Sequence, residues 1–165
     1  MSRPRPAGPA AAAGDFDALM AEVMAHTDRF GHRQHIHLTW LAVRRCGIDA
    51  ATALISDGIR RTARYAGSPQ KYHATMSRAW VELVGHHAAH SDDDTFDDFA
   101  EHHPALLDKR LLARYYRSST LATAAAKSGW VEPDLTPLPR STEADVARAA
   151  HQTASAGRVD LRTRS

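Results

Sequence analysis

Apolar side chains recur every three or four residues along most of this chain, and no segment alternates apolar and polar residues as a β-strand does. The first stripe of this kind begins at Phe16 and the last ends at Tyr115. Such spacing places the apolar residues on one face of a helix, and that face must be buried against other helices. We therefore expect an all-α fold, a single-domain helical bundle of about six or seven helices with flexible termini.

Glycine, proline and capping residues divide this pattern into segments. Gly47 is a typical C-terminal signal of a helix, and the turn Gly67-Ser68-Pro69 is a strong breaker. We expect a flexible N-terminal segment over residues 1–14, a helical domain over 15–139 and a polar C-terminal tail over 140–165. The expected helices cover 15–27, 32–46, 49–66, 70–87, a short segment capped by Ser91 or Asp94, then 104–116 and 118–127.

The composition excludes several classes of protein. Lysine and arginine number 21 against 19 acidic residues, which is not the basic excess of a dedicated nucleic-acid binder. Cys46 is the only cysteine, so the chain forms no internal disulfide, and residues 1–14 lack the apolar core of a secretory signal. No apolar stretch reaches the roughly 18 residues of a membrane span. We expect a cytoplasmic protein with neither a nucleic-acid nor a membrane partner; the oligomeric state stays open.

Common catalytic loops are also missing from the sequence. It contains no GxGxxG or GxxxxGK[ST] loop, so we expect no nucleotide cofactor. It contains no GxSxG elbow, and Cys46 has no evident base beside it. The expected partner is a small-molecule substrate.

Two histidines share an apolar helical stripe in the second expected helix. His32 and His35 lie one turn apart, and the stripe continues through Ile36, Thr39 and Trp40. Because the apolar members of this stripe are large, the face should turn inward. The two imidazoles are therefore expected in a buried place.

A third histidine begins the inward stripe of the fourth expected helix. His73 is followed on that stripe by Met76, Ser77 and Trp80. In an up-down bundle, helices two apart in sequence run parallel, so their N-terminal ends lie at the same level. We expect His73 to meet His32 and His35 in one pocket, whose walls include Thr39, Trp40, Met76, Ser77 and Trp80.

Three functions are compatible with such a pocket. In the first, His32, His35 and His73 are ligands of a first-row transition metal (Fe, Zn or Cu) in an enzyme that acts on a small molecule, for example in a biosynthetic pathway. Glu22 and His26, at i and i+4, are further candidate ligands, although an ordinary surface pair is the better explanation of their spacing. In the second, the three histidines are catalytic acid/base groups of a metal-free isomerase, lyase or cyclase. In the third, the protein is a non-enzymatic metal-binding or accessory protein.

Four short runs of the sequence resemble the motifs of a known family. They are Phe30-Gly31-His32-Arg33-Gln34-His35, Lys71-Tyr72-His73-Ala74-Thr75-Met76, Leu106-Leu107-Asp108-Lys109-Arg110-Leu111 and Trp130-Val131-Glu132-Pro133-Asp134. The family consists of short bacterial helical proteins with FxHxxH, KYHxT and WVxPD motifs. The resemblance implies that His32, His35 and His73 belong to those motifs, and it carries no activity with it. Ala74 stands where the family usually has Glu, so any role of that carboxylate is lost here or is taken over by another residue.

Overall fold

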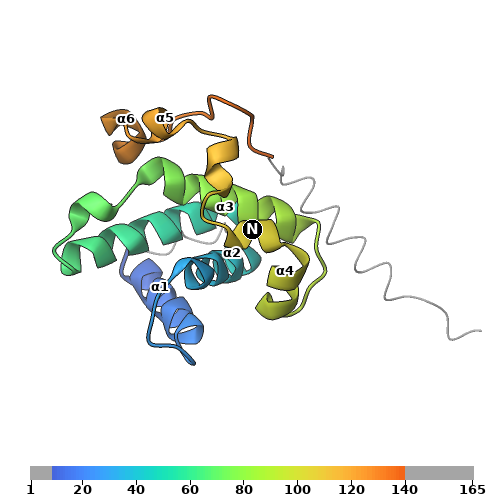
Figure 1. Cartoon of the computed structure of the whole chain (residues 1–165). Helices are drawn as coiled ribbons and strands as arrows, with labels where there is room; N and C mark the ends of the chain where they lie inside the picture. Colours follow the sequence, from blue (N-terminus) through green and yellow to red (C-terminus); the bar gives the residue numbers. More distant parts are fainter. Residues whose placement is uncertain (1–8, 140–165) are drawn as a thin grey trace, which may run out of the picture.

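The computed structural model describes residues 9–139, with side chains from residue 13 onward, and contains only helices and loops in that part of the chain. The expected all-α, single-domain fold is confirmed (Figure 1). No helix in the described residues is long and apolar enough to cross a membrane. The elements are α1 (Pro9–Val23), α2 (His32–Tyr65), η1 (Pro69–Lys71), α3 (Ala74–Ala89), α4 (Phe96–His102), η2 (Pro104–Leu107), η3 (Leu111–Arg114), α5 (Ser118–Leu121) and α6 (Ala124–Ser128).

The first helix begins earlier than expected. Residues 9–14, expected to be flexible, form the first turns of α1, because a run of alanines has the highest helix propensity and Pro9 is tolerated in a first turn. Its inward face carries Phe16, Leu19 and Val23, which are all buried. The expected polar tail, 140–165, lies outside the described residues.

Gly47 interrupts α2, as its sequence position predicts. Its φ of 80° and ψ of 172° are not helical, so α2 consists of two helical halves joined at a kink. The left-handed φ favours glycine, which has no Cβ to clash. The first half carries His32 and His35 in its first turns, and α2 packs against both α3 and α1 (Figure 1).

The start of α3 differs from the expected one. Pro69 begins a 3-10 turn, Tyr72 is extended with φ −70° and ψ 135°, and the α-helix begins only at Ala74. His73 is therefore the N-cap of α3 and not a residue within a helix. The helix expected over 104–116 is also absent: η2 and η3 replace it, because the Asp108 carboxylate accepts the backbone N–H of Arg110 at 2.9 Å and stabilises a turn.

Hydrogen bonds anchor the segment after α6 to the start of α3. The Thr75 hydroxyl donates to the carbonyl oxygen of Gly129 at 2.7 Å and accepts the N–H of Val131 at 3.1 Å. The Tyr116 hydroxyl donates to the Val131 carbonyl oxygen at 2.7 Å. The WVxPD-like run is thus part of the scaffold, and its bonds lie where α6 packs against α3.

Candidate functional site

A cavity of about 580 Å³ lies between α1, the two halves of α2 and the first turns of α3. This volume falls in the range of about 300–1,000 Å³ that is typical of small-molecule sites. Most of its walls are apolar, and all three predicted histidines line it, so the expected common pocket exists. The lining residues are Phe16, Met20, Phe30, His32, His35, Ile59, Thr62, Ala63, Ala66, Ser68, Lys71, His73, Met76, Ser77, Trp80 and Lys109.

The first turn of α2 positions His32, and two contacts hold its ring. Its Nε2 lies 2.9 Å from the carbonyl oxygen of Leu106 and donates to it. The ring also meets Trp80 edge to face, with centroids 4.7 Å apart. Because a neutral imidazole carries one hydrogen, the bond to Leu106 places it on Nε2 and leaves Nδ1 as an acceptor.

One turn further along, His35 is held differently. Its ring centroid lies 6.4 Å from that of His32, but in the described part of the chain no residue hydrogen-bonds to either of its ring nitrogens. Burial, and secondarily the neighbouring His32, lower the pKa of His35 from 6.5 to about 4. His35 is therefore neutral at pH 7, with one donor and one acceptor nitrogen available to a molecule in the cavity.

His73 has both ring nitrogens occupied by backbone groups. Nδ1 accepts the N–H of Met76 at 3.1 Å, which caps α3, and Nε2 donates to the carbonyl oxygen of Leu121 at 2.7 Å. The first bond requires a lone pair on Nδ1, and the second requires a hydrogen on Nε2. His73 thus contributes a wall of the cavity and a junction between α3 and α5.

The predicted pocket walls are correct for α3 and wrong for α2. Met76, Ser77 and Trp80 line the cavity. Trp40 instead lies against α4, with its ring centroid 5.8 Å from that of Phe96. Thr39 is fully buried, and its hydroxyl donates to the carbonyl oxygen of His35 within α2. Both point away from the cavity because α2 is surrounded by different neighbours along its length.

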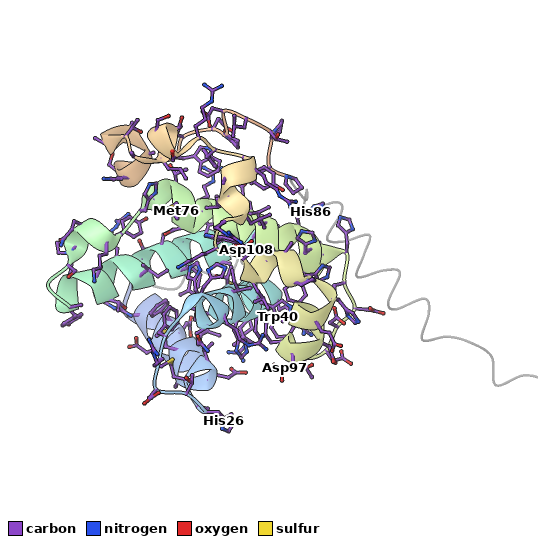
Figure 2. All side chains as sticks on the ribbon, in the orientation of Figure 1. His26, Trp40, Met76, His86, Asp97 and Asp108 are labelled. Atoms are coloured by element: carbon purple, nitrogen blue, oxygen red, sulfur yellow. The ribbon has the colours of Figure 1, made fainter. Side chains whose placement is uncertain are left out.

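The two further candidate ligands also lie elsewhere. The Glu22 carboxylate forms an ion pair with Arg45. His26 is exposed in the turn after α1, and Figure 2 shows it at the tip of that loop, far from Met76. Neither residue lines the cavity, and Glu22 pairs with Arg45 rather than with His26, the partner that the i, i+4 spacing suggests.

The three histidines do not form a ready metal site. Among the described residues, no group of three or more His, Cys, Asp or Glu side chains is placed to hold a metal ion. The hydrogen bonds of His73 explain part of this result, because a ligating nitrogen must offer its lone pair to the metal. His35 and Nδ1 of His32 retain that capacity.

Several cavity residues were not predicted as site residues. Phe16 and Met20 come from α1, and Ile59 comes from the second half of α2. Lys71 is the last residue of η1, and Lys109 lies between η2 and η3. Apolar periodicity did not predict these residues, because their side chains come together only through tertiary packing.

No family model, curated protein or solved structure matches this chain. The resemblance to short bacterial helical proteins therefore stays an expectation. The side chains around the cavity are therefore the basis for inferring a function.

Proposed function

We propose that this protein is a metal-free enzyme that moves a proton on a small apolar molecule held in the cavity, with His35 as the catalytic base. The observation that carries the proposal is the state of His35: a neutral ring that lines the cavity and has no hydrogen-bond partner among the described residues. A ring with a donor and an acceptor nitrogen beside a cavity can offer both to a ligand there.

The neutral imidazole suits proton abstraction followed by return of the proton. One nitrogen accepts a proton from the substrate while the other keeps its hydrogen as a donor. Dry, apolar walls lower the pKa of His35 in the free protein; a substrate that develops negative charge raises it again, toward the working pH. The reaction classes that need only this chemistry are isomerisation, elimination and cyclisation.

His32 supports this role as a positioning residue. Its bond to Leu106 and its edge-to-face contact with Trp80 fix the ring beside His35. A charge on His32 lowers the pKa of His35, so the two rings resist simultaneous protonation.

The hydrogen bonds of His73 favour this mechanism over the metal-dependent alternative. An Fe, Zn or Cu ion bound by all three histidines would have to displace either the N-cap of α3 or the bond to Leu121. A site in which His35 and His32 act on a substrate directly requires no such rearrangement.

Solvent deuterium provides a test that does not require a known substrate. Untagged protein is incubated in D₂O with a pool of small metabolites, and mass spectrometry detects compounds that gain carbon-bound deuterium. We expect labelling by the unaltered protein that EDTA leaves intact and that His35→Gln abolishes. His26→Gln, which changes an exposed histidine outside the cavity, is the matched control and should label normally.

Three results would overturn the proposal. They are labelling that survives in His35→Gln, labelling that EDTA removes, and stable retention of a compound with no labelling at all. The last result would instead establish the non-enzymatic binding protein that the sequence also allows.

A further inference from the structure

We infer that the ligand of this cavity is an apolar molecule carrying a single carboxylate, which lies at the mouth beside Lys71 and Lys109 while the apolar body lies inside. This inference rests on the proposed function and names the chemical class of its substrate. Three features of the described lining residues support this inference separately: the positive charges at the mouth, the apolar interior and the absence of an arginine.

The charge around the cavity has one sign. Lys71 and Lys109 are the charged side chains that line it, and no aspartate or glutamate does so within the described residues. Neither lysine forms an ion pair in that part of the chain. The nearest acidic residue in sequence, Asp108, pairs with Arg110 and so does not neutralise its neighbour Lys109.

Both lysines are exposed, so they mark the mouth rather than the interior. A lysine lays its aliphatic stem along an apolar wall and keeps the ammonium group in water. The two lysines come from separate segments, on either side of α3 and α4 in the sequence, and both line this cavity. An anionic group on a ligand finds its counter-charges there.

The interior accepts an apolar body. Phe16 and Met20 of α1 face the cavity together with Ile59 of α2 and Trp80 of α3. His35 adds no charge to this interior, since it is neutral at pH 7. An apolar group gains favourable burial here, whereas a second charge inside would have no partner.

The cavity, as the described residues form it, lacks one common feature of phosphate sites. Phosphate groups are often held by the guanidinium fork of arginine, and lysine binds them as a point charge. No arginine lines the cavity in the described residues, and the Met76 N–H at the start of α3 is already taken by His73. We therefore assign the anionic group at the mouth as a carboxylate, with the two lysines as its counter-charges.

Three probes with one naphthalene body test the inference: 2-naphthoate, 2-naphthalenemethanol and 2-naphthylmethylammonium. Binding to the full-length protein is measured by calorimetry at two salt concentrations. We expect affinity to fall in that order, and added salt to weaken only the naphthoate complex. The double variant Lys71→Gln/Lys109→Gln should bind naphthoate about fivefold more weakly, as expected for two exposed ion pairs. Lys127→Gln, an exposed lysine of α6 outside the cavity, is the matched control.

A second variant shows whether the probe occupies this cavity. Ala63→Phe fills it from the second half of α2 and should abolish naphthoate binding; if circular dichroism shows that this variant is unfolded, Ala66→Phe replaces it. Equal or tighter binding of the alcohol or the ammonium probe overturns the inference. So does a lysine double variant that binds naphthoate normally, or binding that survives in the filled cavity.

The two proposals fail in different ways. If naphthoate binding depends on the lysines but deuterium labelling survives in His35→Gln, the carboxylate ligand class stands and the catalytic role of His35 is wrong. If labelling depends on His35 but the labelled compounds are uncharged, the catalytic role of His35 stands and the carboxylate ligand class is wrong.

Discussion

The Nε2 atom of His73 donates a 2.7 Å hydrogen bond to the carbonyl oxygen of Leu121, and this bond joins the start of α3 to the end of α5. The other ring nitrogen caps α3 through the N–H of Met76. One imidazole thus satisfies two backbone groups that belong to different elements. His73 shares a cavity with His35, yet the two rings have opposite roles: one completes the scaffold and the other is available to a ligand.

The two bonds of His73 predict a graded loss of stability. His73→Ala removes both, and should lower the free energy of unfolding by about 1–3 kcal/mol, the cost of an N-cap together with an unsatisfied carbonyl group. His73→Asn retains an N-cap acceptor and should lose roughly half as much. Urea denaturation measures both variants. Equal losses for Ala and Asn would show that the cap contributes nothing.

Gly58 determines how closely α1 approaches α2. A Cβ at this position would overlap the ring of Phe16, which also lines the cavity. Gly58→Ala should therefore destabilise the fold by about 1–3 kcal/mol, as other overpacking changes do, and should weaken binding of cavity ligands. Thermal unfolding and naphthoate titration report the two effects.

Gly14→Ala is the matched control for this change. A Cβ at Gly14 meets nothing within 4 Å, and the residue lies within α1. Alanine should stabilise the helix by up to about 1 kcal/mol. A stability loss at Gly14 similar to that at Gly58 would contradict the packing explanation.

Thr75 should be needed to hold the segment after α6 in place. Thr75→Val removes the bonds to Gly129 and Val131 and leaves a buried carbonyl oxygen and N–H group without this partner. We expect a loss of about 1–3 kcal/mol and altered fluorescence of the neighbouring Trp130. Thr27→Val removes only two long, exposed bonds of 3.3 Å to Arg29 in the turn after α1, so it should cost far less stability and leave the Trp130 fluorescence unchanged. Unaltered stability of Thr75→Val would show that the segment is held by other contacts.

Stability should decrease in mild acid because of His35. Its pKa in the folded chain is about 4 and its ordinary value is 6.5, so between these pH values the unfolded chain binds the additional proton. The free energy of unfolding should fall as pH drops from 6.5 to about 4, by at most ~1.4 kcal/mol per pH unit from this residue. His35→Gln should reduce that slope in urea titrations at several pH values. An unchanged slope would place the acid sensitivity elsewhere, for example at His87, whose pKa burial also lowers to about 4.

Helical periodicity predicted the part of the site that lies on continuous helices. His32, His35, Met76 and Trp80 follow the three-and-four spacing, and all of them line the cavity. The same spacing placed Trp40 there wrongly. An apolar stripe shows which face of α2 is buried, but it does not show which element covers that face. The face lines the cavity near His35 and packs against α4 near Trp40.

The remaining features depend on turns and on contacts distant in sequence. The capping role of His73 follows from the break at Pro69, and its second bond reaches Leu121, which lies 48 residues away. Lys109 reaches the mouth because Asp108 turns the chain where apolar spacing suggested a helix. Neither relationship is visible in local spacing, although the runs that carry the family resemblance include both residues.

The protonation state of the His35 ring tests the central claim most directly. A ¹H–¹⁵N spectrum of the histidine ring nitrogens, recorded from pH 7.5 down to pH 4, follows this ring by itself once His35→Gln has identified its signals. We predict a neutral His35 with one bare nitrogen throughout most of this range and a titration midpoint near the pKa of about 4. A midpoint near 6.5, the ordinary value for histidine, would show a solvated ring and would contradict the assignment of His35 as the buried catalytic base.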